Sequence, residues 1–108
     1  MTKKTKAAEY ELITPIGETA DEARNLPIGS LVKLIFGSVT GCDKKYQVVE
    51  SMWVGVTSRN GDIYSGTLDN MPFDRRSLPL KYGDEINFTA DQIRNYVSVE
   101  KIADHVFV

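Results

Sequence analysis

The chain has 108 residues, 42% of them hydrophobic and 26% charged, with a net charge of −2, and these totals predict one soluble globular domain with no room for a second core. Residues 8–108 carry 10 basic against 15 acidic side chains, and because an acidic body repels phosphate backbones, nucleic-acid binding is not expected. No apolar run is long enough to cross a bilayer, and the N-terminus lacks the apolar stretch of a secretory signal, which predicts a cytoplasmic protein with no membrane partner.

The first third of the chain predicts a leader, a short helix and a strand. Residues 1–8 have the composition of a flexible polar leader, followed by a single globular domain over residues 9–108. A short helix is expected from Thr19 to Asn25, because Thr19 is a good capping residue and Glu22 follows three positions later. The segment "GSLVKLIFG" alternates in polarity, which indicates a half-buried strand whose inward face holds Val32, Leu34 and Phe36.

The stretch "VESMWVGVTSRNGDIYSGTLDN", residues 49–70, predicts a β-hairpin. Asn60-Gly61 is the pair that best tolerates positive φ at both central positions of a type I′ turn. A two-residue turn there makes Trp53 oppose Leu68 and places both side chains on one face of the hairpin.

The same register predicts a hollow on that face. Gly55 would oppose Gly66 between the side chains of Trp53 and Tyr64, and paired glycines weaken a strand unless the space between them has a use. A small ligand is one such use. On the opposite face the register places Val54 and Val56.

After the hairpin the sequence predicts a long loop, a short strand and a second short helix. The segment "NMPFDRRSLPLKYGD" is too long for a simple turn. A strand is expected over Glu85–Phe88, and Thr89 with Gln92 three residues later predicts the start of a helix in "TADQIRNYV". The final "HVFV" has the composition of a strand.

The sequence contains little that suggests catalysis or metal binding. His105 is the single histidine and Cys42 the single cysteine, and no local pattern brings either next to a nucleophile or a base. No pair of cysteines or histidines has the spacing of metal ligands. We therefore predict no catalytic residue, no metal and no cofactor, and a small hydrolase is the weakest of the functions considered.

The residue types favour binding instead. Aromatic residues and methionine near arginines are enriched at protein interfaces, and here they gather in the hairpin and the following loop. Two prolines stiffen that loop, which lowers the entropy lost on binding. The alternative is that Met71 and Phe73 turn inward and fill an open end of the sheet. The predicted binding residues are Trp53, Tyr64, Asn70, Met71, Phe73, Arg75, Arg76 and Tyr82.

A longer pattern runs through "ESMWVGVTSRNGDIYSGTLDNMP" and "LKYGDEINFTADQI": Met-Trp-Val, a hairpin, Gly-x-Leu-x-Asn-x-Pro, then Gly-Asp before a strand. Over residues 31–96 this resembles the uncharacterised bacterial domain of the YegJ family. Gly55 departs from the larger residue expected after Trp-Val. The resemblance implies a compact, strand-rich α+β domain of bacteria or phages, of a kind often associated with immunity or defence. The positions that match are Trp53, Gly66, Leu68, Asn70, Pro72, Gly83 and Asp84.

Together these patterns predict an α+β fold: a small twisted, partly rolled, mostly antiparallel sheet of about four to five strands with one or two short helices. The expected function is that of a non-enzymatic cytoplasmic binding protein, an immunity or counter-defence factor that occludes a protein partner. The alternative is a small-ligand-binding domain that uses the hollow of the hairpin.

Overall fold

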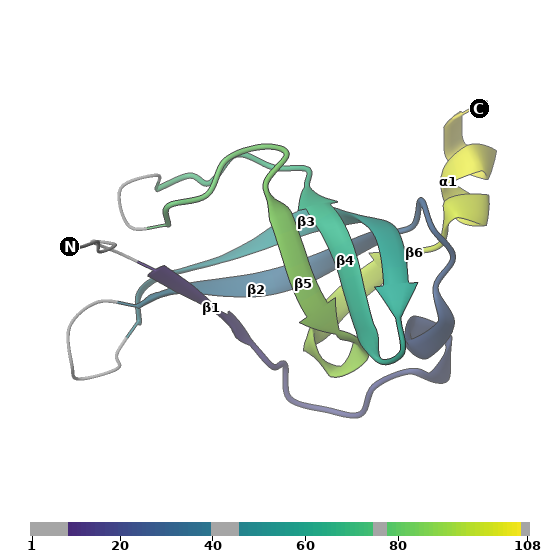
Figure 1. The fold of residues 1–108 in the computed structure, drawn as a ribbon, viewed down its shortest axis with the longest axis horizontal. Coiled ribbons are helices and arrows are strands. Elements are labelled where there is room, and N and C mark those ends of the chain that lie inside the picture. The colour runs from purple at the N-terminus through teal and green to yellow at the C-terminus, as the bar shows by residue number, and fades with distance from the viewer. Residues whose placement is uncertain (1–8, 40–45, 75–77, 107–108) are drawn as a thin grey trace.

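The computed structural model describes residues 9–39, 46–74 and 78–106, which form one curled antiparallel sheet (Figure 1). Its strands are β1 (Glu9–Ile13), β2 (Leu31–Val39), β3 (Tyr46–Asn60), β4 (Ile63–Leu68), β5 (Glu85–Thr89) and β6 (Ile93–Val97). Two 3₁₀ segments, η1 (Asp21–Asn25) and η2 (Ala90–Gln92), and the α-helix α1 (Val99–Val106) complete the described elements. The strand order is β1-β2-β3-β4-β5, and β6 also pairs with β2. No helix in these three segments is long and apolar enough to span a membrane.

The sheet dominates the fold, so the expected α+β class is wrong. The described chain contains six strands but only one α-helix, which has eight residues. The helix expected from Thr19 is only a 3₁₀ segment that begins at Asp21, with Ala20 as its N-cap. The helix expected after Thr89 ends at Gln92, because the next five residues pair with β2 as strand β6. Pairing with β2 therefore overrides the helix signal after Thr89. His105 and Val106, the described part of the C-terminal segment of strand composition, belong to α1.

The long strands of the curled sheet change neighbours along their lengths. β2 pairs with β6 through residues 31–34 and with β1 through residues 35–39. β3 pairs with β2 over its first part and with β4 over its last part. Tyr10 of β1 lies close enough to Asp84, the residue before β5, to sense its charge. Burial and the negative charge of Asp84 both raise the pKa of the Tyr10 hydroxyl. Residues 69–74 and 78–84, called the long loop below, lie at the end of the sheet opposite to the β3–β4 turn (Figure 1).

The concave face of the sheet holds the core. The strand predicted in "GSLVKLIFG" is confirmed, and its three inward residues are fully buried: Val32, Leu34 and Phe36. Val54 and Val56 are buried beside them on β3, on the opposite side of the strand from the partly buried Trp53, as predicted. The rest of this cluster consists of Leu26, Met52, Tyr64, Leu68, Leu78, Leu80, Ile86, Phe88 and Ala90.

The β3–β4 hairpin turns one residue later than predicted. Asn60 pairs with Ile63, so the two turn residues are Gly61 and Asp62 instead of Asn60 and Gly61. Gly61 has a φ of 64°, a conformation that glycine adopts without the steric cost of a Cβ atom. The glycine does define the turn, but it occupies the first central position.

A bulge in β3 then changes which residues face one another. The register shifts at Thr57, whose hydroxyl donates to the carbonyl oxygen of Ser65 at 3.1 Å. Beyond this bulge Val54, rather than Trp53, faces Leu68. The extra residue places the valine and the leucine on the same buried face, whereas the predicted register would have put them on opposite faces.

The glycines of the hairpin are likewise not paired as predicted. Gly66 faces Val56, and Gly55 faces Thr67. A Cβ atom on Gly66 would overlap the carbonyl oxygen of Gly55, so glycine is required there by the close approach of the two strands. A Cβ atom on Gly55 would meet nothing closer than 3.9 Å. The predicted glycine-lined hollow is not formed.

Candidate functional site

The structure separates the eight predicted binding residues into three groups. Three have exposed side chains on the long loop: Met71 (51% exposed), Phe73 (97%) and Tyr82 (64%). Two lie outside the described residues: Arg75 and Arg76. The remaining three have structural partners within the fold: Trp53, Tyr64 and Asn70.

Tyr64 is part of the core. Its side chain is 1% exposed, and its ring stacks on that of Phe88 with 5.2 Å between centroids. Its hydroxyl donates to the carbonyl oxygen of Ala23 at 2.8 Å and accepts from the backbone N–H of Leu26 at 2.9 Å. One buried hydroxyl therefore satisfies two backbone groups and fixes η1 against the hairpin. Because Tyr64 points into the core, it does not share a binding surface with Trp53.

Trp53 and Asn70 hold the start of the long loop. The backbone N–H of Trp53 donates to Oδ1 of Asn70 at 2.5 Å, and its carbonyl oxygen accepts from the N–H of Asp69 at 2.8 Å. The Trp53 indole lies on the convex face, with the ammonium group of Lys33 5.2 Å from the ring centroid. The side-chain oxygen of Asn70 is thus engaged inside the protein, where it extends the pairing of β3 into the loop.

The long loop is also closed at its base. The N–H of Leu68 donates to the carbonyl oxygen of Asp84, and the N–H of Gly83 donates to that of Leu68, both at 2.8 Å. The Asp84 carboxylate accepts from the N–H of Lys81 at 2.9 Å and forms an ion pair with its ammonium group at 3.4 Å. The two ends of the loop are therefore held together where it leaves and re-enters the sheet.

A carboxylate on β3 holds the middle of the loop. Oε1 of Glu50 accepts from the backbone N–H of Phe73 at 2.8 Å, and Oε2 accepts from that of Asp74 at 2.9 Å. Hydrogen bonds to a charged acceptor are stronger than neutral ones. We call this pair of hydrogen bonds the Glu50 clip. Glu50 is not among the residues predicted from the sequence. Its position between Val48 and Met52, where the alternation of the strand predicts an inward side chain, is the signal that points to it.

Leucines of the loop, rather than its methionine and phenylalanine, fill the open end of the sheet. Leu78 is fully buried and Leu80 is 8% exposed, and both belong to the core cluster. Pro72 is buried as well. The side chains of Met71 and Phe73 therefore project from a loop that is anchored on both sides of them.

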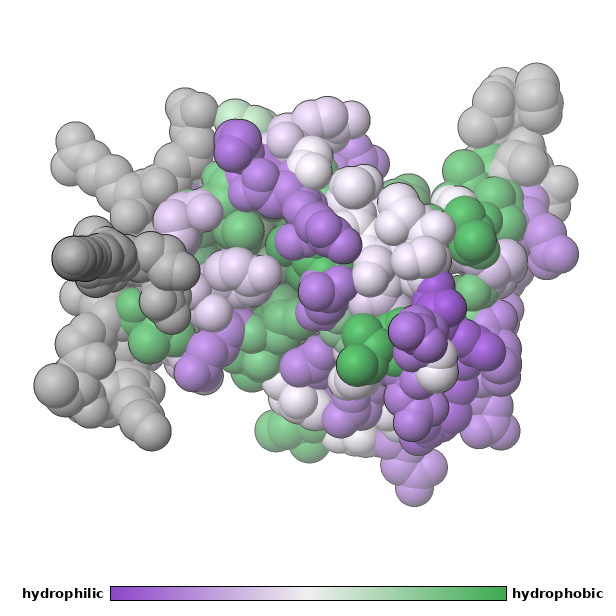
Figure 2. Space-filling view, in the orientation of Figure 1, coloured by the Kyte–Doolittle hydropathy of each residue, from purple (hydrophilic) through white to green (hydrophobic). Residues whose placement is uncertain are grey.

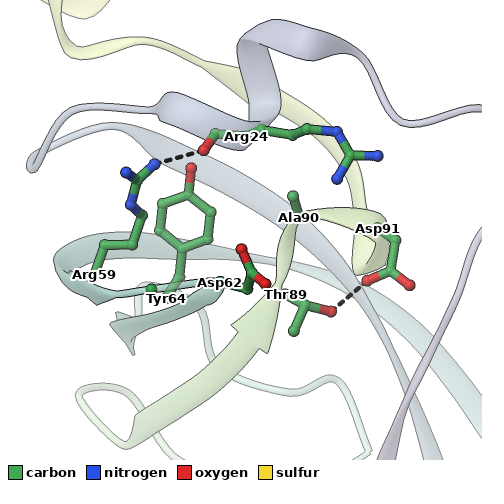
Figure 3. Close-up of a pocket in the computed structure, with 8 residues that line it drawn as sticks. Arg24, Arg59, Asp62, Tyr64, Thr89, Ala90 and Asp91 are labelled. Atoms are coloured by element: carbon green, nitrogen blue, oxygen red, sulfur yellow. Dashed lines mark hydrogen bonds between the residues drawn. The ribbon is translucent and has the colours of Figure 1, made fainter.

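The second candidate region is a polar cavity of about 420 Å³ at the other end of the sheet (Figure 3). Its walls come from η1, the β3–β4 turn and η2, and Figure 2 shows hydrophilic side chains gathered over this end of the molecule. Since these segments are far apart in the sequence, no local motif could have revealed the cavity. The lining residues are Arg24, Arg59, Gly61, Asp62, Tyr64, Thr89, Ala90 and Asp91.

Arg59 fixes one wall of this cavity. Its guanidinium group donates to the carbonyl oxygen of Arg24 at 2.5 Å and to Oδ1 of Asn25 at 3.0 Å. It also lies over the Tyr64 ring, 5.9 Å from the centroid. On the η2 side, the hydroxyl of Thr89 donates to a carboxylate oxygen of Asp91. Hydrogen bonds thus hold Arg59 on one side of the cavity and Asp91 on the other.

The two regions differ in the chemistry of their side chains. In residues 9–39, 46–74 and 78–106, no group of three or more histidines, cysteines, aspartates or glutamates is placed to hold a metal ion. Cys42, the single thiol, lies outside the described residues. What the two regions offer is an exposed aromatic side chain on a braced loop, and charges of both signs around a cavity.

Comparison with known proteins gives one match. The model of a protein family described as uncharacterised and conserved in bacteria (DUF2314) matches residues 18–105. No curated protein and no solved structure matches the chain. The matched range contains both the long loop and the cavity.

Proposed function

The chain belongs to the DUF2314 family, whose members are uncharacterised proteins conserved in bacteria, and from that premise we propose that it is a protein-binding module with its binding site on the long loop. The proposal rests on the exposed side chain and fixed backbone of Phe73. Its side chain is 97% exposed, yet its backbone N–H is held by the carboxylate of Glu50 at 2.8 Å. An aromatic side chain in water on a fixed backbone is arranged for contact with a partner.

The anchoring of the loop favours tight association. The Glu50 clip, the buried Pro72 and the buried Leu78 fix the backbone around Phe73. Ordering a free loop at an interface costs entropy, and a loop that is already ordered avoids most of that cost. The partner therefore meets a surface close to its bound conformation.

The side chains of the loop also have the chemistry of an interface. Phenylalanine, tyrosine and methionine are enriched in the buried centre of interfaces, and Met71, Phe73 and Tyr82 are all exposed on this loop. Burying one large apolar side chain contributes about 1.5–3 kcal/mol. Burial of any two of these three side chains therefore supplies a substantial part of the binding free energy of a specific complex.

For the biological role we propose an immunity or counter-defence factor that acts in the cytoplasm by occluding a protein partner. The motifs that span Trp53 to Asp84 support a kinship with YegJ-type domains, and this kinship is the basis for the proposed role. Co-expression of this protein with the products of its neighbouring genes tests it. Rescue of growth from a toxic neighbour is the expected result, and an absence of any toxic or defence product in the neighbourhood would count against it.

Phe73→Ala is expected to weaken binding of the partner by at least about tenfold, because the lost burial corresponds to about 1.5–3 kcal/mol. The partner is first recovered from a bacterial lysate with the wild-type protein, and its dissociation constant is then measured by calorimetry. The midpoint of thermal unfolding should hardly change, because exposed substitutions usually alter stability by no more than about 0.5 kcal/mol.

Ile16→Ala is the matched control, since Ile16 is just as exposed but lies outside the long loop. It should leave the dissociation constant unchanged. Glu50→Ala, which removes the clip but leaves Phe73 in place, should slow association by making the loop less ordered. If Phe73→Ala and Ile16→Ala bind the partner as the wild type does, the long loop is not the binding site.

A further inference from the structure

The cavity at the β3–β4 turn is lined by two exposed charged side chains that have no partner among the described residues. Arg24 and Asp62 both line it, and within the described part of the chain neither side chain has a hydrogen-bond or ion-pair partner. Figure 3 shows the Arg24 guanidinium group extending above Ala90, away from Arg59, while the Asp62 carboxylate lies lower in the cavity near Thr89. Opposite charges therefore face the same space without pairing with each other.

The backbone that carries these two groups is held firmly. Tyr64 fixes the residues on either side of Arg24 through its hydroxyl, and Arg59 holds the Arg24 carbonyl oxygen. Asp62 sits in a two-residue turn whose flanking residues are paired in the sheet. The fold thus sets the backbone positions from which the two charged side chains extend into the cavity.

The other two charged residues of the cavity are already engaged. Arg59 donates to η1, and Asp91 accepts from the hydroxyl of Thr89. The two arginines balance the two aspartates, so the cavity as a whole carries no net charge. An anion drawn to Arg24 meets the repulsion of Asp62 and Asp91, and a cation drawn to the aspartates meets that of the arginines.

From this arrangement we propose that the cavity binds a small zwitterion, a molecule that carries one carboxylate and one ammonium group, such as a free amino acid or a short peptide. Its carboxylate pairs with the guanidinium group of Arg24, which offers two parallel N–H donors. Its ammonium group pairs with the carboxylate of Asp62. The volume of about 420 Å³ falls within the range of small-molecule sites.

The test is a titration followed by NMR on the ¹⁵N-labelled full chain, with four probes: glycine, diglycine, acetate and methylammonium. Glycine or diglycine should produce saturable shifts in the amide signals of Gly61, Asp62 and Ala90. Acetate and methylammonium each carry only one of the two charges. They should bind at least about tenfold more weakly, which is the fold-change expected from losing one charge-assisted contact.

Arg24→Gln and Asp62→Asn should each weaken binding of the zwitterion by about tenfold. Lys81→Gln and Glu85→Gln make the same changes in charge outside the cavity and should have no effect. The amide spectrum shows directly that each variant is folded. A stronger response to glycine than to diglycine identifies an amino acid as the ligand, and the reverse order identifies a peptide.

Two results would overturn the proposal. The first is equal binding of acetate and glycine, which would show a simple anion site. The second is the absence of saturable shifts with every probe. Neither result bears on the binding site proposed for the long loop, which lies at the opposite end of the sheet (Figure 1) and is tested by Phe73→Ala.

Discussion

Val54→Asp is expected to unfold most of the protein at room temperature. Val54 is 0% exposed, and it pairs with Val32 on one side and with Leu68 on the other. A carboxylate at this position has no hydrogen-bond partner and no water, which costs several kcal/mol, on the order of the whole stability of a small domain. Circular dichroism and chemical denaturation provide the measurement.

Val49→Asp is the matched control, because Val49 lies on the same strand but is 54% exposed. The change in the free energy of unfolding should stay within about 0.5 kcal/mol of zero. Equal stability of the two variants would mean that the core lies on the other face of β3.

Tyr64→Phe is expected to lower the free energy of unfolding, although it removes only one oxygen atom. The carbonyl oxygen of Ala23 and the N–H of Leu26 both lose their partner, at a cost of about 1–3 kcal/mol for each buried group left unpaired. Tyr64→Ala should cost more, since it also removes the ring stacked on Phe88, and truncation of a buried aromatic costs about 3–5 kcal/mol.

Tyr82→Phe controls for the loss of a tyrosine hydroxyl, because Tyr82 is 64% exposed. Its unfolding midpoint should match that of the wild type. If Tyr64→Phe is as stable as this control, the two hydrogen bonds to η1 contribute nothing to the fold. Tyr64→Phe should also loosen η1 and thereby weaken the zwitterion site, while binding at the long loop stays unchanged.

The sequence predicts the strands whose side chains alternate and fails where distant segments decide the structure. Val32, Leu34 and Phe36 repeat every second residue, so the inward face of β2 can be recognised from the sequence alone. The segment that follows Gln92 has a helix-like start, and only its pairing with β2 makes it a strand. That pairing depends on residues far away along the chain, which no local pattern can reveal.

The hairpin shows a subtler limit. The Asn60-Gly61 pair locates the turn to within one residue, yet a shift of one residue reverses the faces of a strand. The bulge at Thr57 restores the burial of Val54 with Leu68, and the sequence carries no signal for it. The candidate sites divide in the same way. The exposed residues of the long loop are predictable from their type, whereas Glu50 and the cavity depend on contacts between distant segments.

Residues in the centre of the sheet are paired with a neighbouring strand on each side, and this pairing should make their amides exchange with solvent more slowly than those of the long loop. Leu31–Leu34 have neighbours in β3 and β6, and Val54 and Gly55 have neighbours in β2 and β4. Their protected amides should exchange with deuterium only when the whole domain unfolds. The amides of Phe73 and Asp74, held by one carboxylate, should exchange much earlier, through local opening of the Glu50 clip. Their exchange rates would therefore report how often the loop leaves its braced conformation while the rest of the sheet stays intact.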